Sequence, residues 1–365
     1  MILHRYIAGA FLRLLLVTLA GFALIVLLID LVEQVRRMEG TGIGFRRTLD
    51  LALLHTPQTL YELLPLIVVL ATVALFVTLA RRSELVVSRA SGRAALVSVA
   101  APVAAAFVVG VVALAILNPF VAATSKRHAT LEQLYRTGGA STLSLSAEGI
   151  WLRQGDADGQ TVIRASRGDP STAVFHEVSL FDYAATGGLT RRIEAREARL
   201  VPGAWDLRGV KLWPLSGPGN PEGMAEEHAS YRLPSPLTPD RIRDSFGQPS
   251  DIAIWDLPAY TETLRSAGFS TRKYQVWMQS ELARPVFLMA MVLIAAAFTL
   301  RHARPGRIGL AVLTSVLMGF ALHYIKNFAQ ILGENGQLPV LAAAWAPPLA
   351  GVLLALGLIL QLEDG

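Results

Sequence analysis

Charged residues beside long apolar runs are the positions at which this sequence could do chemistry. The stretch Arg81–Gly92 (RRSELVVSRASG) separates two uncharged runs, 63–80 and 94–117. As a helix with 100° per residue, it has an apolar, a basic and a small polar face. These faces hold, in that order, Val86, Val87, Ala90 and Ala94; Arg82, Arg89 and Arg93; and Glu84, Ser88 and Ser91. A polar helix between two such runs indicates a cytoplasmic loop, which either only anchors the chain or docks a cytoplasmic partner.

Three more basic residues could bind an anion. Arg36 and Arg37 follow the first apolar run, and Lys326 lies within the fifth. Arginine offers a two-pronged fork to phosphate, so Arg36 and Arg37 either bind the phosphates of an outer-leaflet lipid or only reach the headgroup region. A charge inside a membrane span is costly, so Lys326 either faces a cavity or partner, or packs near the interface.

No enzyme motif is present. The histidines are dispersed without metal-ligand spacing, and G-x-S-x-G is absent. The glycine-rich turn at 40–44 (GTGIG) lacks the lysine of a Walker A motif. Without cysteine there is no thiolate chemistry and no disulfide. We therefore expect no catalytic residue, no metal and no cofactor.

The composition is that of an integral membrane protein. Hydrophobic residues make up 53% of the 365 residues, charged residues only 17%, and the mean hydropathy is +0.45. Soluble domains usually carry about 25% charged residues. The net charge of +5 comes mainly from arginines that are scattered along the chain, which argues for membrane anchoring and against nucleic-acid binding.

Six apolar stretches predict six transmembrane helices. They are 14–32, 49–80, 94–117, 269–300, a fifth that begins at 308 and continues past Lys326, and 338–362. The first stretch could be a signal peptide, but the acidic-basic sequence DLVEQVRR closes it and no A-x-A site follows. We expect the third helix to end or kink at Asn118-Pro119.

The segment between the third and fourth helices has a different pattern. Apolar and polar residues alternate over short runs, and turn residues recur at roughly ten-residue spacing, as in an antiparallel sandwich or jelly-roll. The predicted strands are 141–146, 149–154, 161–166, 173–183, 192–200 and 206–215, with a return strand within 214–239 and a short helix at 252–266.

The distribution of arginines predicts the orientation. With the N-terminus inside, the short inner loops contain Arg81, Arg82, Arg89, Arg93, Arg301, Arg304 and Arg307. The β domain is then outside. Both termini are expected in the cytoplasm.

Four stretches give the chain a resemblance to the LptF/LptG-type permeases of the lipopolysaccharide exporter, more to the LptG type. They are HRYIAGAFL (4–12), LVEQVRR (31–37), YELLPLIVVLATVALFVTLARRSELVVSRASG (61–92) and GQLPVLAAAWAPP (336–348). The expected fold is a membrane α-helical protein of six transmembrane helices with an inserted antiparallel β jelly-roll periplasmic domain. The expected domains are helices 1–3 (1–123, with a coupling helix at 81–93), the β domain (124–265) and helices 4–6 (266–365).

The resemblance implies a half-transporter of the bacterial inner membrane. It would pair with an LptF-type permease, be powered by a cytoplasmic LptB-type ATPase dimer, and pass lipopolysaccharide to LptC- and LptA-type jelly-roll proteins. Glu84 matches the family's coupling-helix glutamate, and the implied coupling residues are Arg82, Glu84, Leu85, Val86, Arg89 and Gly92. Arg36 and Arg37 match a basic pair near the lipid phosphates, and Arg136 and Lys326 complete the candidate lipid contacts.

Two positions depart from the family, and other functions stay open. Asp30 stands where some relatives carry a lysine, and Gln58 where some carry a base. An alternative is a mechanotransmission subunit of another ABC system that moves no lipid itself. A third is a membrane-anchored sensor or adhesion protein, which would leave the SELV stretch unexplained.

Overall fold

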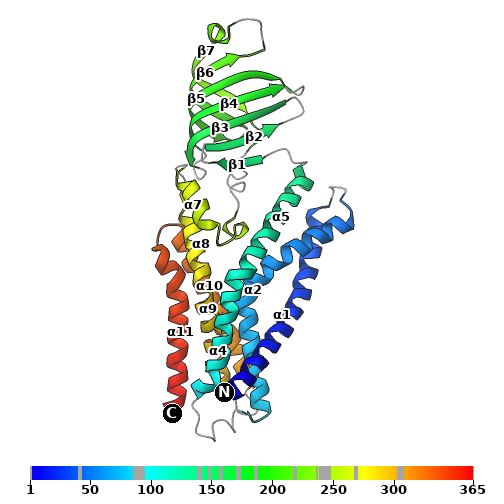
Figure 1. Ribbon diagram of the computed structural model, residues 1–365, viewed down its shortest axis with the longest axis vertical. Coiled ribbons are helices and arrows are strands. Elements are labelled where there is room, and N and C mark those ends of the chain that lie inside the picture. Colours follow the sequence, from blue (N-terminus) through cyan, green and yellow to red (C-terminus); the bar gives the residue numbers. More distant parts are fainter. Residues whose placement is uncertain are drawn as a thin grey trace. The chain divides into compact units, whose positions relative to one another are not determined.

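The computed structural model describes residues 2–364 except for the segments 40–42, 85–94, 138–141, 147–148, 156–158, 170–173, 185–187, 217–219, 236, 238–247, 267–269 and 302–307. The chain forms two compact units. A helical unit comprises Met1–Ala129, Ala253–Trp255 and Arg272–Gly365, and a unit built around a β-sheet comprises Thr130–Ile252 and Asp256–Thr271. Figure 1 shows the elements of both units.

The helical unit contains the membrane spans. Its helices are α1 (Ile2–Arg37), α2 (Phe45–Arg81), α4 (Ala95–Val112), the π-helical turn η1 (Ala113–Leu117), α5 (Asn118–Thr137), α8 (Arg272–Leu282), α9 (Arg284–Arg301), α10 (Ile308–Glu334) and α11 (Val340–Asp364). Within the described residues five helices are long and apolar enough to cross a membrane, and α8 with α9, bent by 52°, forms a sixth. The prediction of six membrane helices with an inserted β domain is confirmed.

Helix α9 is the centre of the helical unit. It contacts α2, α4, α10 and α11, and the residues from Ala290 to Ala297 are all buried. A helix that is apolar on every side belongs in a core, and its many alanines allow neighbouring backbones to approach closely. The closest approach is at Gly110 of α4, where a Cβ atom would lie 2.5 Å from the Cα of Pro285. Gly110 is therefore required for the packing of α4 on α9.

Prolines shape the spans without ending them. The third span continues through η1 into α5 and reaches Thr137, so Asn118-Pro119 marks an irregularity and not an end. Pro285 lies in the first turn of α9, directly after the bend between α8 and α9. A proline is tolerated in a first turn, where its missing N–H would have no partner, and it disfavours helical geometry in the residue before it.

The β unit contains one seven-stranded antiparallel sheet. Its strands are β1 (Thr142–Ser146), β2 (Gly149–Gly155), β3 (Gly159–Asp169), β4 (Val174–Ala184), β5 (Leu189–Val201), β6 (Ala204–Pro214) and β7 (Glu226–Pro234). Each strand pairs with the next in sequence. The antiparallel prediction is confirmed, and the jelly-roll expectation is refined: the described strands form a meander, without the crossovers of a Greek key. The short helices η2 (Pro221–Met224), η3 (Pro249–Asp251) and α7 (Leu257–Ser266) complete the unit.

One face of the sheet forms the core of the β unit. Ile163 on β3, Leu180 on β4 and Ile193 on β5 lie opposite one another in register, and all three are fully buried. Trp205 packs its ring edge-on against Phe175 at 5.6 Å between centroids. The alternation of apolar and polar residues that predicts the strands thus also separates the core face from the outer face.

Candidate functional site

The described part of the Arg81–Gly92 stretch meets the first turns of α1. The Tyr6 hydroxyl donates a 3.2 Å hydrogen bond to Oε1 of Glu84, and Arg82 lies 4.0 Å from the same oxygen. These residues border a cavity of about 200 Å³ together with Arg13. The structure therefore brings Glu84 and Arg82 together, whereas the other predicted coupling residues, Leu85, Val86, Arg89 and Gly92, lie outside the described residues.

The predicted basic pair at the end of α1 is already partly neutralised. Arg36 and Arg37 both bind the Glu33 carboxylate, at 2.9 and 2.8 Å. Helical spacing of three and four residues brings both arginines to Glu33. Their side chains remain 75% and 51% exposed. The guanidinium groups of Arg36 and Arg37 thus remain accessible to an anionic group.

The two positions that depart from the family bind neighbouring helices. The buried Asp30 carboxylate accepts a 3.2 Å hydrogen bond from Thr56 and lies 3.1 Å from Nδ1 of His55. Gln58 accepts a 2.8 Å hydrogen bond from the hydroxyl of Ser125. Asp30 therefore joins α1 to α2, and Gln58 joins α2 to α5.

Lys326 lies against a cavity of about 370 Å³ between α2, α8, α9 and α10. Its Nζ lies 5.5 Å from the centre of the Phe287 ring, a cation–π contact. Glu62, Arg284 and His323 border the same cavity. Of the two positions predicted for Lys326, at a cavity or near the interface, the structure favours the cavity.

A buried ion pair that was not predicted from the sequence lies at the bend between α8 and α9. Arg284 binds both oxygens of Glu281, and the two side chains are only 6% and 2% exposed. The Tyr61 hydroxyl donates to the same carboxylate, and Asn118 Nδ2 donates to it at 3.4 Å. A buried carboxylate needs such partners, because isolation from water disfavours its charge.

Near this ion pair, two side chains donate hydrogen bonds to backbone carbonyl groups to which a proline cannot donate. We call the ion pair with Tyr61 and Asn118 the buried junction. Pro65 cannot donate to the carbonyl of Tyr61, four residues earlier, and Arg284 Nη1 donates to that carbonyl at 3.1 Å. Pro119 likewise frees the carbonyl of Ala115, which accepts from Trp255 Nε1 at 3.5 Å. These partners satisfy backbone groups that would otherwise be unpaired in a membrane. Sequence spacing could have identified the free carbonyls but not their partners.

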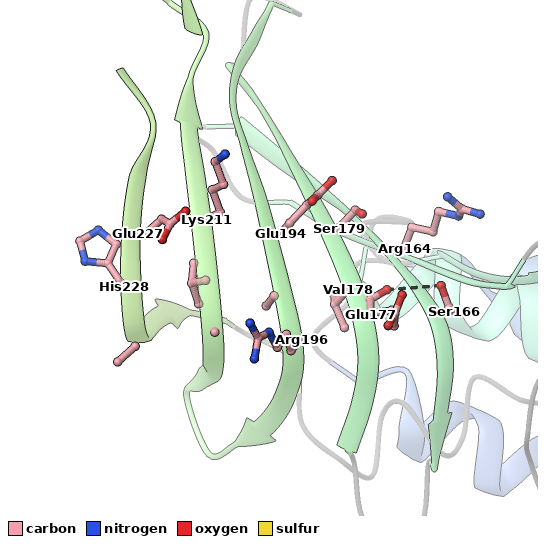
Figure 2. A pocket seen from close by; sticks show the side chains of 14 residues that line it. Arg164, Ser166, Glu177, Val178, Ser179, Glu194, Arg196, Lys211, Glu227 and His228 are labelled. Atoms are coloured by element: carbon pink, nitrogen blue, oxygen red, sulfur yellow. Dashed lines mark hydrogen bonds between the residues drawn. The ribbon is translucent and has the colours of Figure 1, made fainter. Parts of the chain in front are cut away.

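The β unit has a wide hollow on the outer face of its sheet (Figure 2), of about 800 Å³. In each of the strands β3 to β7 one residue is left out of the backbone pairing, and these residues lie in a line across the sheet. Two of them, Glu177 and Gly209, have positive φ angles of 54° and 62°. One row of the lining consists of Arg164, Ser179, Glu194, Lys211 and Glu227. Because acidic and basic side chains alternate there, the hollow favours no ligand of a single charge.

Arg136, the remaining predicted lipid contact, lies in the last turn of α5. The position of its side chain is outside what the structure describes. In the described residues no group of three His, Asp or Glu side chains could hold a metal ion.

Six apolar helical spans with a seven-stranded β unit inserted between the third and fourth define a multi-pass membrane protein. The family model "Lipopolysaccharide export system permease LptF/LptG" matches residues 5–361, and the chain belongs to this family.

Two curated relatives show the same similarity. The lipopolysaccharide export system permease protein LptG of Escherichia coli K12 is 25% identical over 97% of this chain and 94% of its own length. The protein of the same name from Haemophilus influenzae is 23% identical over 99% of each chain. The resemblance to the LptG type is therefore confirmed.

Proposed function

We propose that this chain is a permease subunit of the lipopolysaccharide-exporting ABC transporter. The observation that carries the proposal is the match to the permease family across residues 5–361, which includes both helical segments and the β domain. In this function the chain hydrolyses no ATP itself. It pairs with an LptF-type permease, and a cytoplasmic LptB-type ATPase dimer supplies the energy.

Glu84 is the proposed contact with the ATPase. Its side chain lies just after α2 and is one-third exposed; among the described residues its carboxylate accepts one hydrogen bond, from Tyr6, and lies 4.0 Å from Arg82. A carboxylate has about four acceptor sites, so these contacts leave acceptor capacity that a partner could use. With the N-terminus in the cytoplasm, Glu84 is on the side of the membrane where ATP is available.

The proposed lipid path lies at the opposite ends of the same helices. Arg36 and Arg37 offer exposed guanidinium groups there, and Arg136 and Lys326 are further proposed contacts for the phosphates. The helices α1 and α10 have large exposed apolar side chains, among them Leu24, Leu28, Phe320 and Phe328. Such surfaces suit acyl chains or a partner permease.

The β domain is the proposed exit. On the periplasmic side it would receive the lipid extracted from the outer leaflet and pass it to LptC- and LptA-type proteins. An antiparallel sheet whose last strand, β7, has one edge without a partner strand in the described sheet can be extended by a strand of another protein.

Photocrosslinking tests the proposal. The chain is coexpressed with an LptF-type permease and the ATPase, with a crosslinking amino acid in place of Arg36. We expect adducts with lipopolysaccharide at this position. The matched control is Arg5, which is also exposed but lies at the other end of α1 and should give none. Equal labelling at both positions, or none at Arg36, would argue for a protein that moves no lipid.

A further inference from the structure

Three residues, Ala253–Trp255, form a strap that packs on the helical unit. They belong to that unit, whereas residues 252 and 256 on either side of them belong to the β unit. Ile254 in the middle of the strap is buried, and Trp255 is 63% exposed. The chain thus leaves the β unit, contacts the membrane helices and returns to the β unit at α7.

Two hydrogen bonds join the strap to the irregularity in the third span. The backbone N–H of Ile254 donates to Oδ1 of Asn118 at 2.9 Å, and Nε1 of Trp255 donates to the carbonyl of Ala115 at 3.5 Å. Ala115 lies in the π-helical turn η1, and Asn118 is the first residue of α5. Turns of this type are rare and are frequent at functional sites. The strap therefore binds the third span at the point where its helix is irregular.

Asn118 connects the strap to the buried junction. Its Nδ2 donates to Oε2 of Glu281 at 3.4 Å, while its Oδ1 accepts from Ile254. One orientation of the amide satisfies both partners, because an ionised carboxylate can only accept and a backbone N–H can only donate. Asn118 is itself buried. The closed strap and the bend between α8 and α9 therefore share one side chain.

Few contacts hold the strap in place. Ile254 is its one buried side chain, and the hydrogen bond of the exposed Trp255 is long. Water can replace such a bond at little cost. Segments with few buried contacts open locally at a lower free energy than the core of the protein does. The strap is thus held mainly by Ile254 and its bond to Asn118.

We propose that the strap opens and closes on the third span, and that Asn118 is the positioning residue that holds it closed. When it is closed, the β unit is tied to the helical unit at the strap and at the two ends of the insertion, after Ala129 and before Arg272. When it is open, only the two ends remain. The strap thus controls how freely the β unit moves. Its use rests on the proposed function, in which the β unit must receive lipid from the membrane helices.

Hydrogen exchange of the Ile254 amide tests the opening. The full chain is placed in phosphatidylcholine nanodiscs, and exchange is measured by mass spectrometry at the resolution of single residues. We expect the Ile254 amide to be protected at least about tenfold less than that of Ala295 in α9, and low concentrations of denaturant should not change its protection, as in a local opening. Equal protection of the two amides would overturn the proposal.

Three variants test the role of Asn118. Asn118→Leu removes the acceptor and should lower the protection of Ile254 at least about tenfold further, while Trp255→Phe removes only an exposed donor and should lower it about two- to tenfold. The matched control is Asn327→Leu, since Asn327 bonds to His323 on its own helix and should leave Ile254 unchanged. Unchanged protection of Ala295 in each variant shows that the helical unit stays folded. Unchanged protection of Ile254 in both strap variants would overturn the proposal.

Spin labels test the consequence for the β unit. The chain contains no cysteine, so cysteines introduced at the exposed positions Arg153 on β2 and Asn335 after α10 can be labelled specifically. We expect double electron–electron resonance to give a broader distance distribution in Asn118→Leu than in the unchanged chain or in Asn327→Leu. The same width in all three would overturn the proposal. Because these experiments use no ATP, partner or lipopolysaccharide, their failure is distinguishable from failure of the proposed function.

Discussion

The Glu281–Arg284 pair illustrates how single residues determine the helical unit. Both charges are buried, and Tyr61 and Asn118 supply the remaining hydrogen bonds. Removing one partner would leave the other charge unpaired at low dielectric constant, which costs more than the pair itself contributes. The junction connects α2, α5 and the bend between α8 and α9.

We predict that Glu281→Gln destabilises the chain by about 3–5 kcal/mol. The free energy of unfolding, measured by denaturant titration in micelles, checks this. The double variant Glu281→Gln/Arg284→Met should recover part of the loss, because no charge is left buried alone. Glu262→Gln, which breaks an exposed pair with Arg265, is the matched control and should change stability by less than about 1 kcal/mol. Equal effects in both single variants would contradict the prediction.

The ion pair of Lys211 with Glu222 on the surface of the β unit should make the stability of this unit depend on pH. The hydrogen bond from Lys211 lowers the pKa of Glu222 below its ordinary value of 4.5, and Trp213 donates to the same carboxylate. The same bond to Glu222 raises the pKa of Lys211 above its ordinary value of 10.5. The folded state thus favours both charged forms, and the stabilisation is complete between pH 4.5 and 10.5.

We therefore predict losses of stability at both ends of the pH range. The contribution of Glu222 is lost as the pH falls through its lowered pKa, and that of Lys211 as the pH rises through its raised pKa. Melting temperatures as a function of pH check this, with Glu222→Gln as the comparison. An unchanged pH profile in this variant would show that the pair is irrelevant to stability.

At the scale of elements, sequence patterns predict the structure wherever one face is buried. The alternation around Ile193 and in the strands before it predicts β2–β6 to within a few residues, because burial on one side of a sheet repeats every second residue. The ends of helices are less predictable. The third span continues past Pro119 to Thr137, and the carbonyl of Ala115, to which Pro119 cannot donate, accepts a hydrogen bond from Trp255, 140 residues away in the sequence.

Some candidate site residues can be predicted from the sequence, whereas the contacts between distant residues cannot. Glu84, Arg36 and Lys326 are visible in the sequence because charges stand out against apolar runs. The partnership of Tyr61 with Glu281 is not, because 220 residues separate them and neither has a characteristic spacing. The periodicity of a single helix does not show which polar residues of different spans contact one another.

Close packing of α4 on α9 gives a prediction at the scale of elements. In Gly110→Ala the added Cβ would lie 2.5 Å from the Cα of Pro285, so one helix must shift. We expect a destabilisation of about 1–3 kcal/mol. Gly21→Ala in α1 is the matched control, because nothing lies within 4 Å of the added atom, and helix propensity should make it neutral or slightly stabilising. Unfolding titrations of both variants check the difference, and a stable Gly110→Ala would contradict the observed packing.

At the scale of the whole molecule, the chain combines membrane helices with an inserted β domain. The family match covers nearly the full length, and the LptG relatives are similar over both helical segments and the β domain. The proposed function therefore requires that work done by a separate ATPase enters at Glu84 and leaves as lipid movement.

ATP-driven release of lipopolysaccharide by the reconstituted complex tests this claim most directly. The complex contains this chain, an LptF-type permease and the ATPase, and Glu84→Ala is compared with Tyr6→Phe, which removes the hydrogen bond to Glu84 but keeps the carboxylate. We predict that Glu84→Ala lowers the release per ATP hydrolysed at least about tenfold, the effect of losing a charge-assisted contact, whereas Tyr6→Phe retains most of it. Release at the normal rate by the Glu84→Ala complex would contradict the proposed coupling.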